Sequence, residues 1–132
     1  MANTLYKKYK EASLNADVDL LVDNIKAALI DTGTYTFSQT HDFLDDVSGI
    51  VATSGNLASK VTTDGTFDAA DITFTAVSGS TVEAIILYKD TGTASTSNLI
   101  AYIDTATGLP LTPSGSDVQV VWSSGADKIF TI

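Results

Sequence analysis

The sequence predicts a mainly β fold, a single-domain β-sandwich of jelly-roll type with a short N-terminal helix or arm. Short apolar runs alternate with turns rich in Gly, Asp, Ser and Thr over most of the 132 residues, a spacing that is typical of sandwiches and barrels. Fourteen of the sixteen acidic residues are aspartate, which favours turns and caps, whereas glutamate favours helix interiors. One domain is expected at this length, with residues 1–16 as the helix or arm and residues 17–132 as the body.

The centre of the expected sandwich is a hairpin over Val82–Thr105. Its two strands contain the apolar runs A-I-I-L-Y and L-I-A-Y-I, and such runs suit strands that are covered on both faces. We therefore expect Ile86 and Ile100 to be fully buried where two sheets meet. The loop between the strands is small and polar, and loops often carry contact surfaces. Its candidate contact residues are Thr91, Thr93 and Ser95.

The first residues read as a short amphipathic helix over Asn3–Leu14. Asn3 or Thr4 is the expected cap, and Lys7 and Glu11 have the spacing of an ion pair on one helix face. A helix this short is marginal alone, so it requires a surface to pack on.

The next segment, Asp17–Asp31, has two interpretations. Apolar residues follow a helical stripe, with Asp17 as a cap and Gly33 as a stop. Alternatively, Asp23 and Asn24 form a turn and I-K-A-A-L-I-D leaves it as a strand. Periodicity alone favours the helix.

The remaining chain reads as short elements separated by turns. One helical turn is expected around Phe43, Leu44 and Val47. The strands expected after it are I-V-A-T-S, L-A-S-K-V-T, D-I-T-F-T-A-V, the central hairpin, D-V-Q-V-V-W and K-I-F-T-I. Two prolines and two glycines exclude regular structure from A-T-G-L-P-L-T-P-S-G-S.

Charge is distributed unevenly along the chain. The first ten residues hold three lysines and no acid, whereas all sixteen carboxylates and only four lysines follow, and there is no arginine. An acidic body without arginine is a poor partner for nucleic acid, and no apolar run approaches the ~20 residues that span a bilayer. The asymmetry suggests an arm that contacts an acidic neighbour, although a solvated helix end would look the same. The candidate contact residues in this arm are Tyr6, Lys7, Lys8, Tyr9 and Lys10.

No residue pattern indicates an enzyme. His41 is the only histidine, and although Asp42, Asp45 and Asp46 lie near it in sequence, no serine stands in a nucleophile-elbow context. His41 more simply precedes or caps a short helix.

Two aspartate clusters are weak candidates for Ca²⁺: Asp42 with Asp45 and Asp46, and Asp64 with Asp68 and Asp71. Neither has the spacing and distal glutamate of a calcium loop, so turns and caps explain them better. With no cysteine in the chain, no disulfide or zinc site is expected either. We expect no metal and no cofactor.

A sugar-stacking platform is the remaining candidate site, although core packing is the favoured role of its residues. The aromatic residues considered for it are Trp122 and tyrosines 6, 9, 35, 88 and 102.

Four segments, in order along most of the chain, resemble small structural proteins of tailed bacteriophages. They are D-N-I-K-A-A-L-I-D, T-H-D-F-L-D-D-V, I-I-L-Y-K-D-T-G-T-A-S-T-S-N-L-I-A-Y-I-D-T and V-V-W-S-S-G-A-D-K-I-F-T-I. The resemblance implies a β-sandwich that decorates a capsid or belongs to a tail. It also favours a strand for Ile25–Asp31, against the periodicity, and we adopt the strand.

The sequence-based expectation is therefore a non-enzymatic virion structural protein, assembled in the host cytoplasm. A capsid decoration (cement) role is favoured. A tail or fibre component comes second, and a carbohydrate-binding jelly-roll module third. The expected partners are other virion proteins, the major capsid protein above all, and further copies of this chain in a homo-oligomer. Nucleic acid and membrane are not expected partners.

Overall fold

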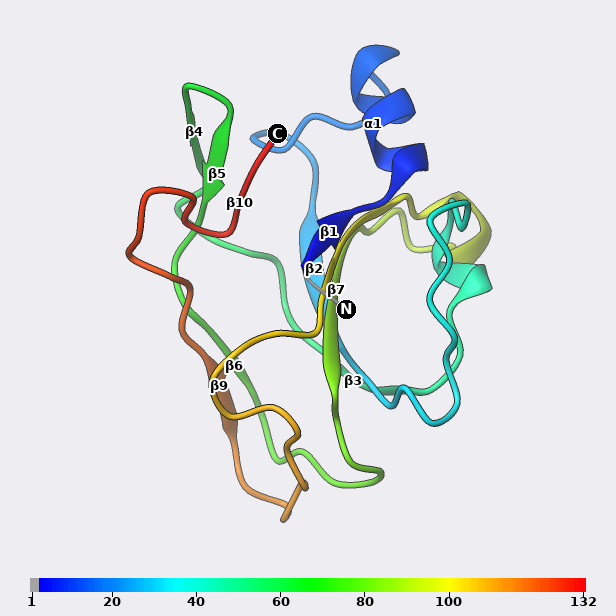
Figure 1. Ribbon diagram of the computed structural model, residues 1–132, viewed down its shortest axis with the longest axis vertical. Helices are drawn as coiled ribbons and strands as arrows, with labels where there is room; N and C mark the ends of the chain where they lie inside the picture. Colours follow the sequence, from blue (N-terminus) through cyan, green and yellow to red (C-terminus); the bar gives the residue numbers. More distant parts are fainter. Residues whose placement is uncertain (1–2) are drawn as a thin grey trace.

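The computed structural model describes residues 3–132 and is built on a five-stranded antiparallel sheet (Figure 1). In spatial order its strands are β1 (Thr4–Leu5), β8 (Leu99–Ile103), β7 (Ala84–Lys89), β2 (Ile25–Ile30) and β3 (Ile50–Thr53). Two smaller antiparallel sheets lie on one side of it, to the left in Figure 1. One contains β10 (Phe130–Thr131), β5 (Thr66–Asp68) and β4 (Val61–Thr63), and the other pairs β6 (Ile72–Phe74) with β9 (Val118–Val120). The mainly β, single-domain sandwich with an N-terminal helix is thus confirmed.

The central hairpin occupies the middle of the five-stranded sheet, as expected. β7 pairs with β8 on one side and, over its whole length, with β2 on the other. Ile86 and Ile100 are both 0% exposed, because each lies on a strand whose two faces are covered.

The segment Ile25–Ile30 is a strand, which confirms the interpretation adopted against the helical periodicity. A helix would bury only one stripe of side chains, whereas β2 lies between β7 and β3 and buries five of its six residues. Leu21 and Val22, which belong to the apparent helical stripe, precede the strand and are 49% and 78% exposed.

The N-terminal helix is shorter than predicted. α1 covers Lys7–Leu14, and Thr4–Leu5 instead pair with β8. Neither expected cap residue caps it: Asn3 binds backbone groups of the chain after β8, and Tyr6 occupies the cap position without a side-chain cap bond. Pairing with an open sheet edge satisfies the backbone groups of residues 4 and 5, so this competes successfully with a first helical turn.

Two further details differ from the expectations. The ion pair on α1 joins Lys8 to Glu11, at 3.1 Å, rather than Lys7 to Glu11. The expected strand D-I-T-F-T-A-V ends at Phe74, and Ala76 lies outside β6, is exposed and has a φ of 49°. The short 3₁₀ turn Leu44–Asp46 does form within the expected segment, and a second one, Ala94–Thr96, lies in the hairpin loop.

The other face of the five-stranded sheet is covered by residues 31–48, to the right in Figure 1. Their aromatic side chains pack on β8, where Phe37 stacks on Tyr102 with ring centroids 4.5 Å apart. Tyr6 meets Phe37 at 5.2 Å, which joins the N-terminal segment to the same layer. Within residues 3–132, α1 is the only α-helix. No helix in this part of the chain is long and apolar enough to cross a membrane.

Candidate functional site

The N-terminal segment has an inner and an outer face. Tyr6 and Tyr9 are 0% and 2% exposed, so these two candidate contact residues fill the protein's own core and are not available at its surface. The side chains of Lys7, Lys8 and Lys10 are exposed. Contact between these lysines and a neighbour stays a prediction.

Backbone and aromatic contacts fix the helix on the body. The Tyr6 N–H donates to the carbonyl of Ile100 at 3.0 Å, and the Tyr6 and Tyr35 hydroxyls are 3.0 Å apart. Tyr9 meets Phe130 edge-on at 6.0 Å. The three lysines are therefore presented by a helix with a defined position and not by a free arm.

Exposed apolar side chains accompany the lysines at one end of the molecule. Figure 1 places α1, residues 15–24, β4 and the C-terminus together at its upper end, which we call the α1 end. Of the seven large hydrophobic residues that are exposed in residues 3–132, five belong to these segments. They are Leu14, Leu21, Val22, Val61 and Ile132. Exposed apolar residues at the same end of a molecule as exposed cations mark that end as a candidate contact surface.

His41 belongs to a chain of hydrogen bonds that begins at Tyr6. Tyr35 links Tyr6 to His41, since the Tyr35 hydroxyl lies 3.0 Å from the Tyr6 hydroxyl and 2.7 Å from Nδ1 of His41. Burial raises the pKa of the Tyr6 and Tyr35 hydroxyls, and in Tyr6 the bond to Tyr35 raises it further. Both phenols therefore stay neutral, and the chain satisfies polar groups inside an aromatic layer.

Asp42 and Asp46 shape the turn that follows His41. The Asp42 N–H donates to Oδ2 of Asp46 at 3.0 Å, and this bond is the main cause that lowers the pKa of Asp46. Burial, and then the hydrogen bond with Asp46, raise the pKa of the Asp42 carboxyl. The side chains thus act as turn-forming groups, while Asp45 is exposed.

Neither aspartate cluster assembles into a metal-binding arrangement. Within residues 3–132, no three His, Asp or Glu side chains converge as the ligands of one ion.

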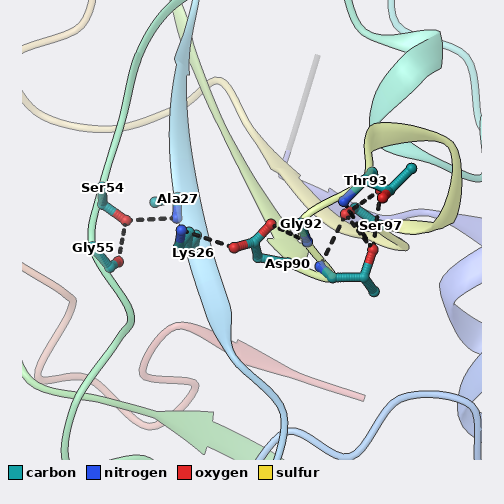
Figure 2. Close-up of polar contacts among 9 residues, drawn as sticks. Lys26, Ala27, Ser54, Gly55, Asp90, Gly92, Thr93 and Ser97 are labelled. Atoms are coloured by element: carbon teal, nitrogen blue, oxygen red, sulfur yellow. Dashed lines mark hydrogen bonds and ion pairs between the residues drawn. The ribbon is translucent and has the colours of Figure 1, made fainter.

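The hairpin loop is stiffened by its own side chains, as Figure 2 shows. Asp90 accepts from the Gly92 N–H at 3.0 Å. The buried Ser97 hydroxyl donates to the Thr93 carbonyl at 2.8 Å and accepts from the Thr91 N–H at 3.1 Å. Thr91 is thus a structural residue of the loop, since its own hydroxyl also bonds to neighbours. Thr93 and Ser95 are exposed, and their role as contact residues stays a prediction.

The aromatic residues considered as a sugar platform are all buried. Trp122 is 9% exposed, and its Nε1 donates to the carbonyl of Ala70 at 3.1 Å. The five tyrosines are each at most 5% exposed, which agrees with core packing. No protein-family model matches this chain, and no curated protein does so either.

Proposed function

We propose that the protein is a non-enzymatic structural component of a bacteriophage virion, a capsid decoration protein that attaches through its α1 end. The observation that carries this proposal is the two-sided N-terminal helix. Buried Tyr6 and Tyr9 hold it in place, while Lys7, Lys8 and Lys10 are exposed, as is Leu14 at the end of the same helix.

Charge suits the lysine-bearing face of α1 to attachment, whereas the neighbouring residues 15–24 carry Asp17, Asp19 and Asp23. The chain carries a net charge of −9, so most of its surface repels an acidic neighbour. Among the lysines of α1, Lys8 forms an ion pair with Glu11 in which both side chains are well exposed. Such exposed ion pairs contribute little to stability. The charge of these lysines remains available to a carboxylate-rich surface on the capsid protein.

Attachment would stabilise the shell by mass action. A subunit that binds the assembled lattice, and not the separated capsid proteins, shifts the equilibrium towards the assembled state. The exposed apolar residues at the α1 end would add buried area at the contact.

Lysine substitution tests the attachment surface more cleanly than deletion of residues 1–10. Deletion would remove β1 and two buried tyrosines from the fold. The triple Lys→Gln variant at positions 7, 8 and 10 changes only exposed side chains, so it should melt like the wild type and bind capsids more weakly, most visibly at low salt. Capsids depleted of this protein are the binding partner in the assay.

A matched control is the double variant Thr93→Ala and Ser95→Ala, which alters the other candidate contact surface. If this control loses binding and the lysine variant does not, attachment runs through the hairpin loop instead of the α1 end. Copy number by quantitative mass spectrometry of purified virions tests the decoration role itself. Hundreds of copies support it, whereas a handful indicates a tail component.

A further inference from the structure

A cavity of about 740 Å³, open to solvent on one side, lies between the two layers of the sandwich. Its walls are side chains from the facing surfaces of two sheets. The five-stranded sheet contributes Leu29, Ile85 and Ile103 to one wall. The other wall contains Val118 and Val120 of β9, and Trp122, which follows that strand. The volume falls in the range of about 300–1,000 Å³ that small-molecule sites occupy.

Hydrogen bonds fix both sides of this cavity. The Trp122 N–H donates to Oδ1 of Asp71 at 2.9 Å, and its indole Nε1 donates to the Ala70 carbonyl at 3.1 Å. On the opposite side, Asn3 binds the backbone of Thr105 through both its amide nitrogen, at 3.2 Å, and its oxygen, at 2.9 Å. A ligand would therefore meet walls that are already in place, which reduces the entropy lost on binding.

The one charged side chain that lines the cavity is a cation. Lys128 is the only ionisable residue among those that line the cavity, although the chain has sixteen acids. Its Nζ has one hydrogen bond, a long one of 3.4 Å to the Ser124 carbonyl, and it takes part in no ion pair within residues 3–132. The neighbouring Asp127 is directed to the Thr131 hydroxyl, from which it accepts a bond of 3.0 Å.

We infer that this cavity binds a small apolar molecule that carries a single anionic group. The apolar part lies between the sheets against Ile103, Val120 and Trp122, whose apolar surface it covers. The anionic group lies at the ammonium of Lys128. This inference is independent of the proposed virion role, since it depends only on the cavity.

Dodecanoate is a suitable probe, because it combines a flexible apolar chain with one carboxylate. Trp122 is the only tryptophan and it lines the cavity, so its fluorescence reports on occupancy. Dodecanoate brominated at its terminal carbon should quench this fluorescence saturably, below the micellar concentration and with an unchanged far-UV spectrum. Calorimetry with unlabelled dodecanoate should give one site per chain.

Two variants locate the site. Lys128→Gln should weaken dodecanoate binding by about twofold to fivefold, the effect of one half-exposed ion pair, and leave binding of neutral dodecanol unchanged. Lys10→Gln, which removes an exposed lysine from α1, should bind both probes as the wild type does. Val120→Phe should reduce the affinity for both probes by filling the cavity, and its melting curve shows whether it is folded.

Three results would overturn the inference. The first is quenching of the wild type that does not saturate. The second is equal dodecanoate affinity in Lys128→Gln and wild type, which would remove the anion preference. The third is a wild-type protein that self-associates and excludes dodecanoate, because the cavity would then be filled by another protein copy.

Discussion

Replacing Ser54 by alanine should destabilise the protein far more than its small change in volume suggests. Ser54 is 7% exposed and lies at the end of β3, where the chain turns away from β2. The Ser54 N–H donates to the Ala27 carbonyl at 2.8 Å, as in a regular strand pair. The acceptor of the second bond is a side chain, since the Ala27 N–H donates to the Ser54 hydroxyl oxygen at 2.9 Å. The hydroxyl then donates to the Gly55 carbonyl at 2.7 Å, as seen in Figure 2.

The size of the loss in unfolding free energy follows from the Ala27 N–H, which loses its acceptor in Ser54→Ala. Ala27 is 0% exposed, so in Ser54→Ala its N–H would have no acceptor and little access to water. Leaving one buried donor unsatisfied costs about 1–3 kcal/mol. For a domain of this size that corresponds to a fall in melting temperature of roughly 3–12 °C. Gly55 is exposed, so water can replace the bond to its carbonyl.

Thermal and urea unfolding of three variants measures this effect. Ser54→Ala should show the full loss, and Ser54→Cys, which keeps the shape with a weaker hydrogen-bonding group, an intermediate one. Ser95→Ala is the matched control, because Ser95 is exposed, and it should melt like the wild type. If Ser54→Ala also melts within a degree of the wild type, the side-chain bond does not complete the ladder of β2 and the reasoning fails.

Three further substitutions probe the core and the carboxylates. Ile86→Ala removes most of a side chain that is 0% exposed and should cost about 2–5 kcal/mol in urea unfolding; wild-type stability would show that the hairpin is not the centre of the fold. The hydrogen bond from Lys26, part of a 2.8 Å ion pair, is the main cause that lowers the pKa of Asp90. The ion pair between Lys26 and Asp90 therefore stabilises the fold above the unfolded-state pKa of Asp, about 3.9. This stabilisation is lost as the pH falls through the lower folded-state pKa of Asp90. Asp90→Asn should cost about 1 kcal/mol at pH ~7 and progressively less in acid, and a loss that persists below both pKa values would exclude the ion pair as its cause. The pKa of Asp42 is raised, by burial and by Asp46, so its charged form is disfavoured in the fold as the pH rises; Asp42→Asn should melt higher at neutral pH and lose that advantage in acid.

The strands that the sequence predicts well are those with continuous apolar runs. β7 and β8 follow from A-I-I-L-Y and L-I-A-Y-I, since short apolar runs bounded by turn residues are typical of strands covered on both faces. Periodicity misassigned β2, because its burial comes from neighbours on both faces and the pattern of one segment does not reveal those neighbours. The strand at Ile25–Ile30 is confirmed, whereas the resemblance to phage proteins that favoured it stays a prediction.

The contacts that the sequence could not predict join residues far apart in the chain. Asn3 binds the backbone of Thr105, Tyr6 meets Tyr35, and the Trp122 N–H reaches Asp71. Each depends on which strands become neighbours, and local patterns do not contain that information. The cavity was missed for the same reason: its walls come from elements that only the sheet topology brings together.

The five residues Tyr6–Lys10 show how one segment divides between core and surface. The sequence marks them as a single contact arm, because it contains tyrosines and lysines without an acid. On α1, however, residues three apart share a face, so Tyr9 and Ala12 are buried together, and Tyr6 is buried separately at the extended cap position before the helix. Lys7, Lys8 and Lys10 remain outside. The tyrosines determine where the lysines are held. Substitutions of the tyrosines should therefore alter stability and attachment together, whereas substitutions of the lysines should alter attachment alone, and this difference separates a positioned contact surface from a flexible arm.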